Sequence, residues 1–195
     1  MLTLHFVSCD IAMNRQEFRN WLMDNHQTAT ETYIPISRAK VPAADCVPYI
    51  DAVEEALCFG WIDSVNRSID GVHYSRFSPR RKGSNWTELN KARCRRLIRL
   101  GLMTEAGFRA LPDLDAPLQI QPWIIDEFRK HAEAYSNFLK FPELYQRIRL
   151  SNIDFADRHL RKHDDAVKKL QRLIETSAQN KLYGEWNDNG RLLNE

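Results

Sequence analysis

The chain has 195 residues, a formal net charge of +2 and an apolar fraction of 43%, which is typical of a folded globular protein and not of a disordered chain. No apolar stretch is long enough to span a membrane, and the N-terminus lacks a secretion signal, so we expect a cytoplasmic protein. The four cysteines form no C-x-x-C pair, so we expect reduced structural thiols. We predict neither a bound metal nor a cofactor.

The N-terminal part of the chain predicts alternating strands and helices. An apolar run over residues 2–8 favours a strand, and Asn14 is placed to cap a helix over residues 15–26. A further strand is predicted over residues 32–37. Within it, Pro35 favours an edge or a bulge, because proline has no N–H to donate to a neighbouring strand.

A helix is predicted after a loop over residues 40–47. Pro48 suits its first turn and Gly60 suits the position just past its end. Helical periodicity places an apolar face toward the core, with Asp51 and Glu54 facing away.

A turn signal at Asp70-Gly71 predicts a hairpin of two strands, over residues 61–68 and 72–78. Strand alternation places Trp61, Asp63 and Val65 on one face of the first strand, with Ser64 on the other. On the return strand the residues that share a face are Tyr74, Arg76 and Ser78.

The next helix is predicted to begin at a cap on Ser84 or Asn85 and to end near Leu100. Its apolar stripe contains Trp86, Leu89, Leu97 and Leu100, and the opposite, solvent-facing stripe contains Lys91, Arg95 and Arg99. Asn90 and Arg93 fall on the apolar stripe. A guanidinium in that position must be paired or must line a cleft.

The remaining sequence is helical in pattern, over residues 104–111, 122–133, 142–159 and 164–181, with a short segment around Phe138. Trp186, Leu192 and Leu193 indicate that the C-terminal tail docks on the protein. We therefore predict an α+β fold with a small, mostly antiparallel sheet. Residues 1–111 would form its core, and residues 112–195 a helical extension packed on that core as one globular unit.

Charge is unevenly distributed along the chain. Residues 67–99 carry a local net charge of +8, so the rest of the chain carries −6. This asymmetry indicates an anionic partner for the middle segment. We therefore predict that a small anionic ligand binds in a basic cleft between the hairpin and the following helix, lined by Trp61, Asp63, Ser64, Arg76, Ser78, Arg80, Arg81, Trp86, Asn90 and Arg93.

Other interpretations of the same residues stay open. Arg93 alternatively pairs with a carboxylate such as Asp63 or Glu55 and joins helix to sheet. An enzyme would use Asp63 or Glu55 as its general acid or base. A module that binds nucleic acid or an acidic protein would use the basic helix face of Lys91, Arg95 and Arg99.

Known catalytic motifs are missing from the sequence. The phosphate-binding P-loop, the Gly-x-Ser-x-Gly elbow and the dinucleotide-binding glycine pattern are all absent. His159 and His163 have a helical i, i+4 spacing, but they lie among cations that disfavour a metal, so we expect an exposed helix face.

Several motifs together resemble a known family: Glu54-Glu-Ala-Leu-Cys-Phe-Gly-Trp-Ile-Asp63 within the run from Tyr49 to Ser64, then Arg76-Phe-Ser-Pro-Arg-Arg81, Ser84-Asn-Trp86 and Asn90-Lys-Ala-Arg93. Over residues 15–110 the chain resembles the YdeI/OmpD-associated family, also labelled bacteriocin-protection proteins. The resemblance implies a small bacterial protein related to stress or antimicrobial-peptide resistance. It does not extend to that family's basic C-terminal segment, which this chain lacks.

Overall fold

The structure of the protein is a computed structural model that describes residues 13–39, 45–69 and 71–193. The strand predicted over residues 2–8 lies outside the described residues. The chain divides into two compact units. The first comprises Met1–Asn85 and Cys94–Pro112, and the second comprises Trp86–Arg93 and Asp113–Glu195. The predicted α+β class is confirmed, because the first unit contains a sheet and the second is helical.

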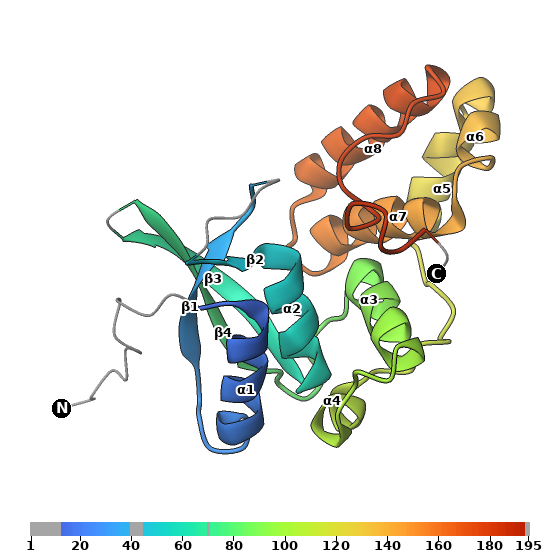
Figure 1. The fold of residues 1–195 in the computed structure, drawn as a ribbon. Coiled ribbons are helices and arrows are strands. Elements are labelled where there is room, and N and C mark those ends of the chain that lie inside the picture. Colours follow the sequence, from blue (N-terminus) through green and yellow to red (C-terminus); the bar gives the residue numbers. More distant parts are fainter. Residues whose placement is uncertain (1–12, 40–44, 70, 194–195) are drawn as a thin grey trace. The chain divides into compact units, whose positions relative to one another are not determined.

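The sheet of the first unit has the strand order β2-β1-β4-β3 (Figure 1). Its strands are β1 (Thr32–Ser37), β2 (Val47–Pro48), β3 (Trp61–Ile69) and β4 (Val72–Pro79). Among the strands of the described residues only the β1–β2 pair is parallel, so this sheet is mostly antiparallel as predicted. Val47, predicted to end a loop, instead pairs with Ile36 as part of β2.

Pro35 lies in β1 at a position where no strand on one side requires its N–H as a hydrogen-bond donor. It pairs with Tyr74 of β4, whereas the two-residue β2 reaches only Ile36 and Ser37. Among the described residues, β1 therefore has a neighbouring strand on one side only at Pro35. This local edge accommodates the missing N–H within an inner strand.

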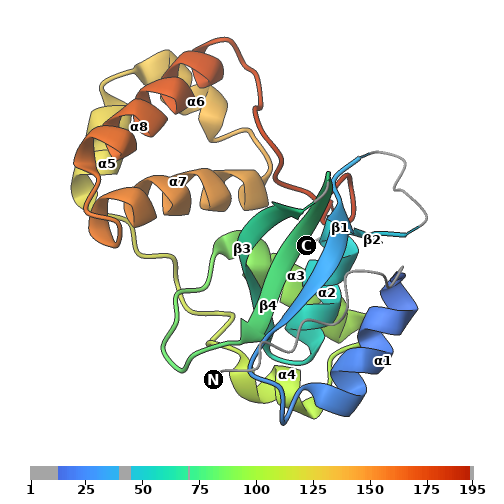
Figure 2. The same cartoon turned by 90° about the vertical axis from the view of Figure 1, so that its left-hand side faces the viewer.

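The first unit also contains helices α1 and α2, which are labelled in Figure 2. Helix α1 (Arg15–Asn25) begins at a capping box, in which the Asn14 side chain accepts from the Glu17 N–H and the Glu17 carboxylate accepts from the Asn14 N–H. Helix α2 (Tyr49–Cys58) follows Pro48 and ends before Gly60, whose φ of +73° is in the left-handed region. Both ends of α2 thus agree with the prediction.

Helix α3 (Glu88–Arg99) begins later than predicted. The Asn90 N–H donates to Thr87 Oγ1 at 3.1 Å, so Thr87 and not Ser84 or Asn85 supplies the first side-chain acceptor. The first half of α3 belongs to the second unit and its second half to the first unit. Helix α4 (Glu105–Ala110) follows a cap at Thr104 and belongs to the first unit.

The second unit contains four further helices: α5 (Pro122–Arg129), α6 (Ala132–Phe138), α7 (Glu143–Arg158) and α8 (His163–Ala178). The single helix predicted over residues 122–133 is wrong, because the chain leaves helical geometry at His131. The tail docks as predicted through the buried Leu192 and through Trp186, whereas Leu193 is exposed. Among the described residues, no helix combines the length and apolar character needed to cross a membrane.

Candidate anion-binding site

The predicted site residues Arg80 and Arg81 lie in the loop over residues 80–84, which we call the basic loop. Arg80 anchors it, because its N–H donates to Gly60 O and its Nη1 donates to Ser84 Oγ (3.2 Å) and Asn85 O (3.1 Å). Arg81 and Lys82 are exposed, and neither forms an ion pair within the described part of the chain. The loop therefore presents two adjacent cations on a hydrogen-bonded backbone.

Arg80 differs from Arg81 and Lys82 in being partly buried. Burial lowers the pKa of Arg80, while the nearby Cys94 and Asp63 act in the opposite direction. Because an arginine keeps its proton at neutral pH even so, Arg80 contributes a fixed positive charge at the base of the loop.

Asp63 lies on β3 and is held by helix α2. The Tyr49 hydroxyl donates to Asp63 Oδ2 at 2.7 Å, and the Arg38 guanidinium lies 3.5 Å from the centre of the Tyr49 ring. Burial, together with the negative charge of Asp63, raises the pKa of Tyr49, so the phenol stays protonated as a donor. The negative charge of Asp63 also favours the protonated form of Arg80, against the effect of burial on the pKa of that guanidinium.

A β-bulge follows Asp63 and changes the predicted strand faces. Asp63 pairs with Phe77 and Asn66 pairs with Ser75, so two residues of β3 oppose one residue of β4. Asn66 consequently accepts a hydrogen bond from the buried Ser75 hydroxyl. Strand alternation predicted Val65 on the same face as Trp61, but beyond the bulge Val65 is 50% exposed, whereas Trp61 is 1% exposed.

The structure brings Arg76 and Ser64 together, but a carboxylate neutralises the positive charge of Arg76. Arg76 Nη1 donates to Ser64 Oγ at 3.2 Å, and Arg76 Nε forms an ion pair with Glu31 at 2.6 Å. Ser78 is half-buried and pairs with Ile62 across the hairpin. Arg76 therefore has its counter-charge within the protein.

Trp61 is a core residue and does not form the wall of an open cleft. It is 1% exposed, it packs edge-on against Trp21 with ring centres 5.7 Å apart, and its Nε1 donates to His26 O. A side chain this buried presents no surface to a ligand, so this part of the predicted site needs correction.

The other three predicted site residues, Trp86, Asn90 and Arg93, belong to the second unit. Arg93 is 7% exposed, and its Nε and Nη2 donate to the two carboxylate oxygens of Asp188 at 2.6 and 2.8 Å. Its Nη1 donates to Asn90 Oδ1. Arg93 is thus paired, as the structural interpretation expects, but with Asp188 instead of Asp63 or Glu55. No sequence spacing indicates a partner 95 residues away.

The carboxylates of helix α2 are also occupied. Glu55 forms ion pairs with Arg15 and Arg19, both at 2.6 Å, and Glu54 pairs with Arg96 at 2.8 Å. Both glutamates are buried, so the prediction that Glu54 faces away from the core is wrong. Asp51, also predicted to face away, pairs with Arg15 at 2.8 Å.

The basic face of α3 is less solvated than predicted. Lys91 is mostly buried against Glu88, at 2.8 Å, and Arg147 pairs with the same carboxylate at 2.7 Å. Arg95 is half-buried and Arg99 is exposed. Three arginines of residues 67–99 are therefore neutralised by carboxylates that lie outside this segment in the sequence, which are Glu31, Glu54 and Asp188.

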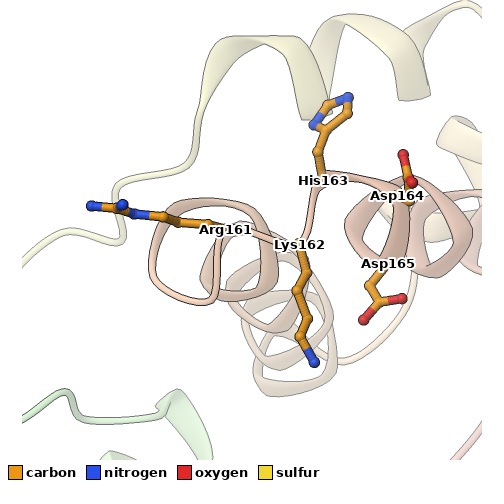
Figure 3. A pocket seen from close by; sticks show the side chains of 5 residues that line it. All are labelled: Arg161, Lys162, His163, Asp164 and Asp165. Carbon is orange, nitrogen blue, oxygen red and sulfur yellow. The ribbon is translucent and has the colours of Figure 1, made fainter.

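A shallow pocket of about 440 Å³ lies at the start of α8 in the second unit, lined by Arg161, Lys162, His163, Asp164 and Asp165 (Figure 3). His163 Nδ1 lies 2.9 Å from Asp157 Oδ1. The two histidines were predicted to lie on one helix face. Instead, His159 caps the end of α7 and His163 begins α8. Among the described residues, no group of three metal-binding side chains occurs.

Comparison with known proteins gives one family. No curated protein and no solved structure matches the chain. A family model described as a domain of unknown function (DUF8412) matches residues 11–110, which is just over half of the chain. The matched segment includes the basic loop, Asp63 and Arg93, but not Asp188. The chain therefore belongs to the family of the domain of unknown function DUF8412.

Proposed function

We propose that the protein binds a small anionic ligand, a phosphorylated or carboxylated metabolite, through the basic loop of the first unit. The observation that carries this proposal is the pair of exposed cations Arg81 and Lys82 beside the anchored Arg80. A guanidinium and an ammonium next to each other offer charge-assisted hydrogen bonds to an oxyanion. Because the loop is already hydrogen-bonded, little ordering of its backbone opposes binding.

Asp63 has a supporting role in this proposal. Its carboxylate is fixed by Tyr49 and lies in electrostatic range of Arg80. In that position it orients the guanidinium or accepts a hydrogen bond from a ligand hydroxyl. If the protein is instead an enzyme, only Asp63 stays a candidate for its general acid or base, because Glu55 is buried and forms ion pairs with Arg15 and Arg19.

We also propose a cytoplasmic location and the relation to stress or antimicrobial-peptide resistance that the YdeI/OmpD-associated resemblance implies. Cys46, Cys58 and Cys94 are free thiols, which fits a reducing compartment. This biological role stays a prediction, and it rests on the sequence motifs alone.

A thermal-shift screen of phosphorylated and carboxylated metabolites tests the binding proposal, since a ligand that binds only the folded state raises its melting temperature. The test variant is Arg81→Ala/Lys82→Ala. The matched control is Lys168→Ala/Lys169→Ala, which removes the same charge from two adjacent exposed residues of α8. Each lost charge-assisted hydrogen bond is expected to cost about 1.5–3 kcal/mol of binding free energy, so affinity should fall at least tenfold in the test variant only.

The outcomes are distinguishable. Equal affinity in both variants would refute a role for the basic loop. Retention on single-stranded DNA or heparin, with affinity that falls steeply as salt is added, would instead favour the polyanion-binding alternative.

A further inference from the structure

Two arginines of the second unit are buried, and they differ in their counter-charge. Arg93, 7% exposed, is neutralised by both carboxylate oxygens of Asp188. Arg149, on α7, is 9% exposed and forms no ion pair with any carboxylate in the described part of the chain. A buried positive charge without a negative partner is unfavourable, so the surroundings of Arg149 need an explanation.

Arg149 is only partly satisfied by its neighbours. Its Nη2 donates to the carbonyl oxygens of Tyr183 and Glu185. Its guanidinium carbon lies 4.9 Å from the centre of the Tyr145 ring and 4.4 Å from that of Tyr183. Its Nε is fully buried and has no hydrogen-bond partner among the described residues. Aromatic faces and carbonyl oxygens supply partial negative charge but no full counter-charge.

A second cation lies against the same tyrosine. The guanidinium carbon of Arg172, an exposed residue of α8, is 4.6 Å from the centre of the Tyr183 ring. Arg172 also forms no ion pair in the described residues. Burial raises the pKa of Tyr183, although the two arginines oppose the shift, so its hydroxyl remains a hydrogen-bond donor at neutral pH.

The backbone next to Tyr183 is shaped around Arg149. Gly184 has a φ of +64°, and a Cβ atom there would lie 3.0 Å from Arg149 Nη2. Glycine therefore permits both the left-handed conformation and the close approach of the tail to the guanidinium. The cluster is thus defined by contacts of α7, α8 and the tail within one unit.

We propose that Arg149, Arg172 and Tyr183 form a second anion-binding site, specific for a small oxyanion such as a phosphate group. An oxyanion supplies the full negative charge that neither guanidinium has among the described residues, together with acceptors for the donors that the carbonyl oxygens of Tyr183 and Glu185 do not engage. This site shares no residue with the basic loop, so it goes beyond the function proposed above. It also lies outside the segment that the family model matches.

The experiment titrates inorganic phosphate into the full chain at constant ionic strength, with sodium chloride as the compensating salt. All proteins carry Arg81→Ala/Lys82→Ala, so that the basic loop contributes nothing. Binding is followed by the melting temperature and by the Nε–Hε NMR signals of Arg149 and Arg172. The variants are Arg172→Ala and, as control, Lys140→Ala, which removes an exposed cation of the same unit.

We expect phosphate to raise the melting temperature and to shift both arginine signals in the parent and in Lys140→Ala. In Arg172→Ala the dissociation constant for phosphate should rise at least tenfold. Because Arg172 is exposed, this variant should fold and retain its unliganded melting temperature. Identical titrations in all three proteins, or no response to phosphate in the parent, would overturn the proposal. Neither result bears on the basic-loop proposal, which the thermal-shift screen tests separately.

Discussion

At the scale of single residues, Arg93 and Asp188 show how this chain accommodates a buried charge. Three of the Arg93 nitrogens have acceptors, two on Asp188 and one on Asn90. Asp188 is 3% exposed, so both members of the pair are removed from water. The hydrogen bonds offset the desolvation of each charge only while both partners are present.

Removing one partner should therefore be more harmful than removing both. Asp188→Ala leaves Arg93 buried without a counter-charge, and we expect it to lower the free energy of unfolding by about 3–5 kcal/mol. The double variant Arg93→Leu/Asp188→Leu should lose less. Urea unfolding measures both, with Arg109→Ala as a control that breaks the exposed pair with Glu105. Equal losses in the single and double variants would contradict this account.

Cys58 gives a second prediction at this scale. Burial, together with the negative charge of Glu55, raises the pKa of the Cys58 thiol to about 11. At pH 8 only about one Cys58 in a thousand is then the reactive thiolate. In native protein treated with iodoacetamide, mass spectrometry should find Cys46, which is only half-buried, alkylated before Cys58. The rate at Cys58 should rise about tenfold per pH unit. Equal rates at both thiols at pH 8 would show that Cys58 is not shielded.

At the scale of elements, local signals predicted the hairpin and helix α2 well. Pro48, Gly60 and Gly71 act on their own neighbours, so sequence alone reveals both ends of the helix and the change from β3 to β4; Asp70 itself lies outside the described residues. The bulge after Asp63 was missed because alternation assumes a regular strand. Periodicity also assigned Glu54 to solvent, since it treats a carboxylate as exposed unless a distant arginine is known to cover it.

Helix α3 owes part of its stability to the ionised carboxylate at its start. Burial alone would raise the pKa of Glu88, but hydrogen bonds from Lys91 and Arg147 outweigh this effect and hold the pKa below its usual value of 4.5. A carboxylate whose pKa is lowered by folding stabilises the protein above its unfolded pKa. That stabilisation is lost as the pH falls through the lower pKa of the folded state.

Comparison of the wild type with Glu88→Gln should reveal this dependence. We expect the difference in unfolding free energy between them to be constant from pH 7 to about pH 6 and to shrink below about pH 4.5. Denaturant unfolding at each pH measures it, and Glu105→Gln, at an exposed pair, provides the control. A difference that grows on acidification would mean that Glu88 is protonated in the folded protein.

At the scale of the whole molecule, the two units do not coincide with a simple cut of the sequence. We predict a boundary near residue 111; the first unit ends at Pro112, but residues 86–93 belong to the second unit. In that unit Glu88 pairs with Arg147, Arg93 pairs with Asp188, and Ala92 packs with Leu144, Ile148 and Leu192. The family match ends at residue 110, before all of these partners.

A chain truncated after Pro112 should therefore show a divided helix α3. Its residues 89–93 lose their partners, whereas residues 94–99 keep theirs in the first unit, including the Arg96–Glu54 ion pair. Hydrogen exchange should be faster than in the full chain at the first group of amides and unchanged at the second. The amides of β3 and β4 report whether the first unit still folds. Uniform protection along α3 would show that residues 86–93 need no partner in the second unit. Loss of protection throughout the sheet would show that the first unit does not fold by itself.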